Sequence, residues 1–283
     1  MKSRLQYWTW VVSAGPWIVL AGVFVIFSSS ASDRNVLPAG GRNFLVFDGL
    51  LYRNKPDLAK FGMLPIKPVS QLWRPGVSKS EVDEATTREA MLAVKDFDGL
   101  IYLDIENWPV CNVPDSVIQE SLRKLTRIAL LTRETSPAAK FGFYSLMPER
   151  VYWPIVNNDS QKILDWQKCA ERAETLAQHV DVIFPSLYTF YDDETSWKIY
   201  AEKILREARR YKKPVYAFLW PDFHDSNKQL KGTRIPGKFW RAQLDLVRRN
   251  ADGIVIWGGW QKEWDDQAEW WNETRDFLAK MER

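Results

Sequence analysis

The segment Asp98-Gly-Leu-Ile-Tyr-Leu-Asp-Ile-Glu-Asn-Trp-Pro109 joins a short apolar run to two acidic residues. Leu100–Leu103 has the composition of a buried strand, and Asp104 and Glu106 follow it directly. Side chains two residues apart on a strand share a face and lie about 6.5 Å apart. Two close carboxylates repel each other, which raises the pKa of one of them. A proton-holding acid beside a charged carboxylate is what glycosidic bond cleavage needs.

Asp-x-Glu pairs are common on solvated faces and at helix caps, so the pair gains meaning only from its place in the fold. Strand-like apolar runs alternate with helix-like amphipathic runs along most of the chain. We expect strands at 44–47, at 63–66 or 69–73, and at 100–103, 140–145, 181–188, 214–219 and 253–257. We expect helices after Ser80 and at 115–133, 160–179, 194–211, 237–250 and 264–281.

This alternation predicts the fold class. Strands that alternate with helices pair in parallel through right-handed crossovers. No glycine-rich phosphate loop follows any expected strand, which disfavours a nucleotide-binding doubly wound sheet. We therefore predict an α/β protein, a distorted or incomplete (β/α) TIM-type barrel with about seven parallel strands. We expect residues 33–283 to form this barrel as a single catalytic domain, because no linker divides them.

The N-terminus has the features of an export signal. Lys2 and Arg4 precede Trp8–Phe27, a run of 20 residues without a charge, and the small residues 28–32 follow. This pattern is typical of a signal peptide, and the run is also long enough to span a bilayer as an N-terminal hydrophobic helix. We interpret residues 1–32 as a signal anchor or a signal peptide. Either one places the remainder outside the cytoplasm, with membrane contact through the helix if it is uncleaved.

Composition excludes other classes of function. The 39 basic and 36 acidic residues give a net charge of only +3, which offers no case for a nucleic-acid partner. The chain has two cysteines, Cys111 and Cys169, and two histidines, His179 and His224, whose spacing matches no metal site. We expect no metal and no cofactor. In an exported protein the cysteines can form one disulfide, but no sequence argument brings them within bonding distance.

The ends of the expected strands carry a distinctive set of side chains. Barrel enzymes place their chemistry at the carboxyl ends of the strands. Carboxylates, tyrosines and tryptophans that converge on one rim predict a sugar-binding cleft, with a polysaccharide or oligosaccharide as substrate. In chain order the rim residues are Asp48, Asp104, Glu106, Tyr144, Tyr188, Trp220, Asp222, Trp257 and Trp260.

Four blocks around these residues resemble one family. Tyr102–Trp108, Gly142–Pro148, Pro214–Asp225 and Gly253–Trp260 are similar to blocks of the hyaluronidase family of glycoside hydrolases, and they occur in the family's order. The resemblance is to a divergent, bacterial member. It implies an incomplete, distorted (β/α) barrel that is an endo-N-acetylhexosaminidase and cleaves by a retaining, substrate-assisted mechanism.

The resemblance also implies roles for single residues. Glu106 matches the general acid/base, and Asp104 matches the carboxylate that orients the substrate's N-acetyl group, whose own carbonyl oxygen attacks the anomeric carbon. The remaining matches are aromatic residues that line the cleavage subsite: Tyr144, Trp257 and either Tyr188 or, in another register, Tyr191.

The chain departs from the family at Trp220, where an arginine is usual. A guanidinium suits a uronic acid carboxylate, whereas an indole suits an uncharged sugar face, so we expect a bacterial polysaccharide with N-acetylhexosamine rather than hyaluronan. Two alternatives stay open. Asp48 or Asp222 can act as a protein nucleophile, or the barrel can be a non-catalytic protein of glycan binding or envelope polysaccharide assembly.

Overall fold

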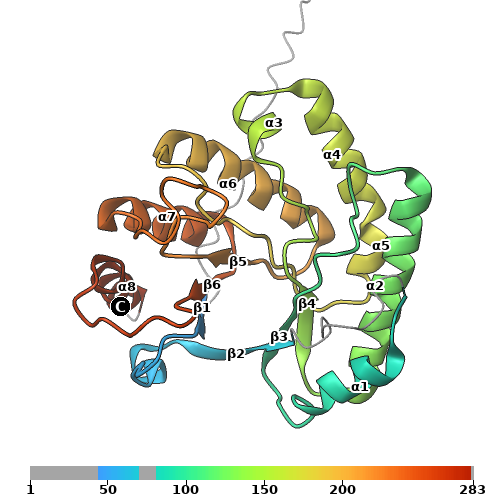
Figure 1. The fold of residues 1–283 in the computed structure, drawn as a ribbon, viewed down its shortest axis with the longest axis horizontal. Helices are drawn as coiled ribbons and strands as arrows, with labels where there is room; N and C mark the ends of the chain where they lie inside the picture. Colours follow the sequence, from blue (N-terminus) through green and yellow to red (C-terminus); the bar gives the residue numbers. More distant parts are fainter. Residues whose placement is uncertain (1–43, 70–80, 282–283) are drawn as a thin grey trace, which may run out of the picture. The chain divides into compact units, whose positions relative to one another are not determined.

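The computed structural model describes residues 44–69 and 81–281, which lie in one compact unit, Pro38–Arg283. Within these residues, six strands form one parallel sheet in the order β4-β3-β2-β1-β6-β5. Figure 1 shows this sheet curling, with helices along its outer side. The strands are β1 (Leu45–Leu50), β2 (Leu64–Val69), β3 (Leu100–Leu103), β4 (Lys140–Phe143), β5 (Tyr216–Leu219) and β6 (Gly253–Gly258).

The expected strand at 181–188 lies between β4 and β5, the two edge strands of the sheet. Phe184 pairs in parallel with the residue that follows β4, and Ser186 pairs in parallel with Phe218 of β5. Pro185 between them has no N–H to donate, which explains single bridges in place of a regular strand. The segment thereby joins the edges of the curled sheet. The partial TIM-type barrel is confirmed, with six regular strands instead of about seven.

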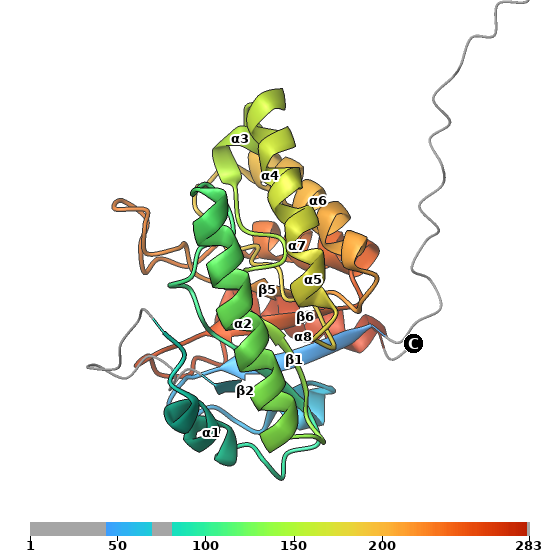
Figure 2. The ribbon, with the colours of Figure 1, turned by 90° about the vertical axis from the view of Figure 1, so that its right-hand side faces the viewer.

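The helices form the outer layer. Figure 2 shows α1, α2 and α5 side by side, and contacts join α1 to α2 and α2 to α5. The helical elements are η1 (Leu58–Phe61), α1 (Glu84–Leu92), α2 (Asp115–Thr135), α3 (Tyr152–Val156), α4 (Ser160–Arg172), α5 (Glu174–Ala177), α6 (Glu194–Ala208), η3 (Arg209–Tyr211), α7 (Gly237–Asn250) and α8 (Glu269–Met281).

Three expected helix boundaries are wrong, each for a local reason. Asp83, not Ser80, caps α1, since its side chain accepts a hydrogen bond from the N–H of Thr86 at 2.9 Å. The expected helix at 160–179 is two helices, because α4 ends at Arg172 and α5 begins at Glu174 after the cap residue Ala173. The expected helix start at residue 264 is too early. The Asp265 side chain there accepts the N–H of residue 267 at 2.9 Å, which forms a turn before α8.

The two faces of the sheet belong to different hydrophobic clusters. On β3, Ile101 and Leu103 pack in the large cluster that includes the helices, whereas Leu100 and Tyr102 pack in a smaller cluster. Alternate side chains of a strand point to opposite faces. The smaller cluster therefore fills the concave face of the curled sheet, and its members are Phe47, Ile66, Leu100, Tyr102, Tyr144, Val182, Phe184, Tyr188, Phe218 and Val255.

The predicted export segment at residues 1–32, including its hydrophobic helix, lies outside the described residues, as does most of the alternative strand at 69–73. Across residues 44–69 and 81–281, the structure contains no helix of sufficient length and apolarity to cross a membrane.

Candidate active site

A cavity of about 240 Å³ opens where the strands end. Its lining comes from β3, β5 and β6, from the segments that follow β3, β4 and β5, and from residues 182–189 between β4 and β5, which we call the 182–189 segment. The lining residues are Tyr102, Asp104, Glu106, Tyr144, Arg150, Tyr188, Phe218, Trp220, His224, Asp225 and Trp257.

Most of the predicted rim residues meet in this cavity. Strand alternation explains why, because the concave face carries Leu100 and Tyr102 and the same parity continues to Asp104 and Glu106. Tyr188, and not Tyr191, lines the cavity. The predicted residues brought together here are Glu106, Asp104, Tyr144, Tyr188, Trp220 and Trp257.

The two carboxylates of the cavity differ in environment. Asp104 is half-buried, whereas Glu106 is exposed. Burial and, as the smaller cause, the negative charge of Glu106 together raise the pKa of Asp104 to about 6. The pair repulsion expected from the sequence is therefore present, and it acts on the carboxyl that sits deeper in the cavity.

Tyrosines supply neutral hydroxyl groups to the cavity. The hydroxyl of Tyr144 donates to Oγ of Ser186 at 3.0 Å. Burial raises the pKa of Tyr144 and of Tyr188 above the usual tyrosine range, so both stay protonated. Tyr188 also stacks on Trp257, with 5.8 Å between ring centroids. These rings form a rigid aromatic wall that ends in hydroxyl donors.

Trp220 is held in this wall by close packing. Its ring lies 5.4 Å from Tyr188 and 5.1 Å from Trp257, edge to face in both pairs. A Cβ on Gly258 would approach the Trp220 indole to 2.6 Å, and the φ of Gly258 is +137°. Only glycine tolerates both conditions. The indole therefore occupies a fixed place on the cavity wall.

The predicted rim residues do not include Arg150, His224 and Asp225, all of which line the cavity. The Arg150 guanidinium lies 5.1 Å from the Phe190 ring centroid, and the His224 ring lies 4.7 Å from the same centroid. Burial lowers the pKa of His224, and Arg150 lowers it further. Nδ1 of His224 accepts the N–H of residue 226 at 3.1 Å, so the neutral ring carries its proton on Nε2. No local motif marks these residues.

Three predicted site residues do not line this cavity. Asp48 shares its strand parity with Val46 and Leu50, which pack in the outer cluster, so it faces away from the concave side. It accepts a hydrogen bond from Lys55 Nζ at 2.5 Å. Trp260 follows β6 but is 67% exposed.

Asp222 is the third, and it is a structural carboxylate. Its side chain is fully buried and forms ion pairs with Arg234 at 2.6 Å and with Lys262 at 2.7 Å. Arg234 also donates to the hydroxyl of Tyr52 at 2.5 Å. Two cations thus hold Asp222 in place, and neither Asp48 nor Asp222 lies where a nucleophile for this cavity is needed.

The loop that carries the acid pair is fixed from the outside. Cys111 and Cys169 form a disulfide, with 5.3 Å between their Cα atoms, which joins the loop after β3 to α4. Glu149 accepts a hydrogen bond from the backbone N–H of Val110 in the same loop. The pairing that the sequence left open is therefore formed, and it restrains the segment that follows Glu106.

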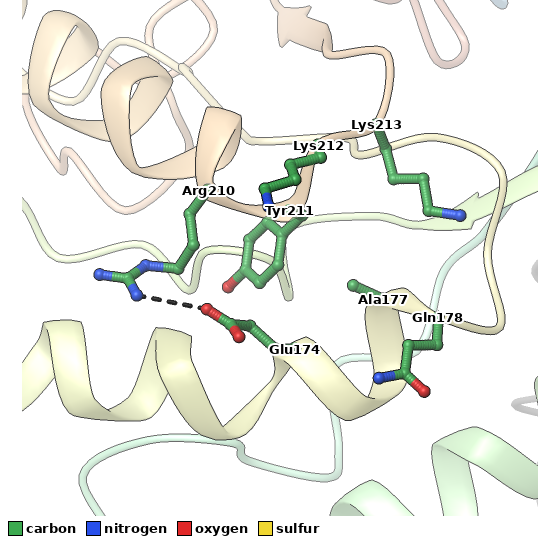
Figure 3. A pocket seen from close by; sticks show the side chains of 7 residues that line it. All are labelled: Glu174, Ala177, Gln178, Arg210, Tyr211, Lys212 and Lys213. Atoms are coloured by element: carbon green, nitrogen blue, oxygen red, sulfur yellow. Dashed lines mark hydrogen bonds and ion pairs between the residues drawn. The ribbon is translucent and has the colours of Figure 1, made fainter.

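A second cavity of about 390 Å³ lies between α5 and η3, at elements that precede strands. Figure 3 shows Arg210 paired there with Glu174, and the two side chains lie 3.2 Å apart. Tyr211 also lines the cavity and donates to the carbonyl oxygen of residue 170 at 3.1 Å. Active sites of barrels lie at the opposite strand ends.

Metal binding has no structural support in the described residues. Within 44–69 and 81–281, no three His, Cys, Asp or Glu side chains are grouped so that they could hold a metal ion.

The fold resembles solved glycoside hydrolases. Bee venom hyaluronidase matches with a TM-score of 0.61 at 16% identity, over 84% of this chain and 97% of that chain. The same enzyme in complex with a hyaluronic acid tetramer matches with a TM-score of 0.51 at 14% identity, over 85% and 96%. No protein-family profile matches the chain, and no curated protein sequence matches it significantly. At these identities the likeness shows a shared fold.

Proposed function

We propose that the protein is a glycoside hydrolase that cleaves a polysaccharide containing N-acetylhexosamine. The observation that carries this proposal is the presence of Asp104 and Glu106 in one cavity with Tyr144, Tyr188 and Trp257. Aromatic rings and hydroxyl donors bind a sugar ring. An acid pair beside them can transfer a proton to the glycosidic oxygen.

The first half of the proposed reaction uses both acids. Protonated Glu106 donates its proton to the glycosidic oxygen of the leaving sugar. Ionised Asp104 accepts a hydrogen bond from the N–H of the substrate's N-acetyl group, which directs the carbonyl oxygen of that group to the anomeric carbon. The C–O bond to the leaving sugar breaks, a cyclic oxazolinium forms, and Asp104 stabilises its positive charge.

The second half reverses the role of Glu106. As a carboxylate it takes a proton from a water molecule, and the resulting hydroxide opens the cyclic intermediate at the anomeric carbon. Two inversions at this carbon retain its configuration. The scheme needs no nucleophile from the protein, and the ion pairs that hold Asp48 and Asp222 outside the cavity support it.

The aromatic wall supports a sugar without a carboxylate at the cleavage subsite. Trp220 presents an indole where the resembling family has an arginine, and Gly258 leaves the space in which that indole packs. An indole stacks on the apolar face of a neutral sugar ring. We infer that the sugar cleaved next to Trp220 is uncharged.

Turnover of N-acetylhexosamine polymers by Glu106→Gln tests this proposal. We expect cleavage to fall about 100- to 10,000-fold with an unchanged melting temperature, because Glu106 is exposed. Asp225→Asn is the matched control, since it removes another exposed carboxylate from the same cavity. Full activity of Glu106→Gln contradicts the assignment, and an equal loss in Asp225→Asn indicates a protein nucleophile instead.

A thiazoline that mimics the cyclic intermediate tests substrate assistance separately. We expect it to inhibit wild-type protein competitively, because transition-state-like ligands bind more tightly than substrates. If the wild type binds oligosaccharides but cleaves none of them, the alternative of a non-catalytic glycan-binding protein is correct, since the same aromatic wall binds sugar in either case.

We also propose that the barrel works outside the cytoplasm. The disulfide between Cys111 and Cys169 supports this location, because such bonds persist in oxidising compartments. The sequence of residues 1–32 supports it independently, as a signal anchor or a signal peptide.

A further inference from the structure

Trp153 of α3 is an aromatic side chain at the surface, with 51% of it exposed. Two neighbouring rings hold the indole: Tyr191 lies 4.8 Å away and Tyr152 lies 5.2 Å away, between ring centroids. Tyr191 is itself half-buried. We call Trp153 and Tyr191 the aromatic platform. A flat ring fixed by its neighbours offers binding surface that loses little conformational entropy when a ligand is bound.

A row of rings connects the aromatic platform to the cavity of the acid pair. Tyr152 lies 5.9 Å from Phe190, and Phe190 lies 4.7 Å from His224, which lines the cavity. Arg150 also lines the cavity and stacks on Phe190 at 5.1 Å. The ring contacts therefore run without a break from His224 in the cavity lining to Trp153, and three of them separate the two residues.

The position of the aromatic platform in the fold agrees with this continuity. Trp153 follows β4, and Tyr191 follows the 182–189 segment, so both lie beyond the carboxyl ends of these elements, as the cavity does. The sequence comparison left Tyr191 as an alternative to Tyr188 in the cleavage subsite. The structure gives the two residues separate places, since Tyr188 lines the cavity and Tyr191 packs on Trp153.

We propose that the aromatic platform is a distal sugar-binding subsite that holds another residue of the glycan whose bond is cut at Glu106. This inference rests on the proposed function and adds to it a second place, away from the acid pair, at which the glycan is held. A monosaccharide at the acid pair cannot reach Trp153, whereas a longer chain along the row of rings stacks the apolar face of a sugar on the indole.

Charge near the platform indicates which sugar it takes. Asp192 and Asp193 follow Tyr191 and are exposed. Asp193 is fixed as the cap of α6, where it accepts the N–H of Ser196 at 3.0 Å. Two carboxylates beside the ring repel an anionic sugar and leave a neutral hexose or N-acetylhexosamine as the occupant.

Binding to oligosaccharides of two lengths tests the subsite. The parent protein carries Glu106→Gln, which we expect to bind oligosaccharides without cleaving them. The test variant carries Trp153→Ala in addition. The control is Leu164→Ala, which removes another exposed apolar side chain, on α4. The probes are hexasaccharides and disaccharides of chitin, hyaluronan and chondroitin, measured by titration calorimetry. We expect Trp153→Ala to weaken hexasaccharide binding about tenfold and disaccharide binding less than twofold, with no change in the control.

The outcomes separate this inference from the proposed function. Equal effects on both lengths, or no effect on the hexasaccharide, overturn the subsite, and so does a parent that binds none of the probes. A length-dependent loss in a protein whose wild type cleaves nothing supports the subsite and overturns the hydrolase. A length-dependent loss together with wild-type turnover supports both.

Discussion

Asp104 and Asp222 are buried or half-buried carboxylates that follow strands of the same sheet, and their surroundings are opposite. Asp222 lies between two cations, Arg234 and Lys262, in a fully buried position. Asp104 faces a cavity and shares it with a second acid, Glu106, whose charge helps to raise the pKa of Asp104 to about 6. One environment stabilises the negative charge and the other opposes it.

This difference separates structural acids from acids available for chemistry. A carboxylate that is paired with cations holds its loop in place. A carboxylate whose negative charge is opposed by burial and by a like charge is instead stabilised when a positive charge forms beside it. Removing the negative charge at the two positions should therefore have opposite consequences for folding and for activity, which matched Asp→Asn substitutions measure.

We expect the largest effect from Asp104→Asn. Activity on polysaccharide should fall about 100- to 1,000-fold, because the amide cannot stabilise the positive oxazolinium. At pH 8 the folded state should become more stable by about 1–2 kcal/mol, since the variant removes a charge that burial and Glu106 oppose. Initial rates and urea unfolding measure the two effects. A variant that is both inactive and less stable contradicts the interpretation of Asp104.

Asp222→Asn should act in the opposite direction. The substitution leaves Arg234 and Lys262 without their shared carboxylate, and we expect unfolding free energy to fall by about 2–3 kcal/mol. The catalytic rate of the protein that remains folded should stay within about threefold of wild type, because Asp222 lies outside the cavity. Urea unfolding and active-site-normalised rates measure this. Loss of rate at full stability would assign Asp222 to the reaction.

Removal of the disulfide comes next in size. The bond closes a loop with a sequence separation of 58 residues, so Cys111→Ser with Cys169→Ser should lower unfolding free energy by about 2 kcal/mol, near the lower end of the usual range. The loop after β3 carries Glu106, so we also expect a lower kcat with little change in KM. Thermal unfolding and steady-state kinetics measure this, with dithiothreitol-treated wild type as the reference.

Much of the fold and part of the site can be predicted from the sequence. The alternation of side chains along each strand explains which site residues could be predicted and which could not. The apolar runs predict most strands well because these strands are buried on both faces, as in Leu100–Leu103. Most residues of β2 are exposed, and the sequence left the position of this strand open. The parity of Asp104 and Glu106 relative to Tyr102 places them on the concave side, and the sequence contains this information. The same alternation places Asp48 on the outer face of β1, yet only the structure shows which face of each strand points to the concave side.

Other features depend on tertiary contacts that local sequence does not encode. Arg150 and His224 meet at Phe190, and the three residues come from different loops. The cations that bury Asp222 lie 12 and 40 residues away along the chain. The Cys111–Cys169 pairing requires the packing of α4 near the loop after β3. Sequence patterns with a period of two or 3.6 residues describe single strands and helices, so they cannot predict contacts between residues of different elements.

The pH dependence of activity tests the comparison most directly. In the proposed reaction Asp104 must be ionised to stabilise the positive intermediate, and its pKa is about 6. As pH falls below 6, kcat/KM should decrease about tenfold per pH unit.

Stability should change in the opposite sense. The folded-state pKa lies above the usual value of 3.8, so the Asp104 charge destabilises the folded protein fully above pH 6, and this penalty disappears as pH falls toward 4. The control is Asp104→Asn, whose residual activity should lack this acidic limb. If the limb persists in that variant, another group with a pKa near 6 controls the reaction, and Asp104 does not differ from Asp222 in the way the comparison requires.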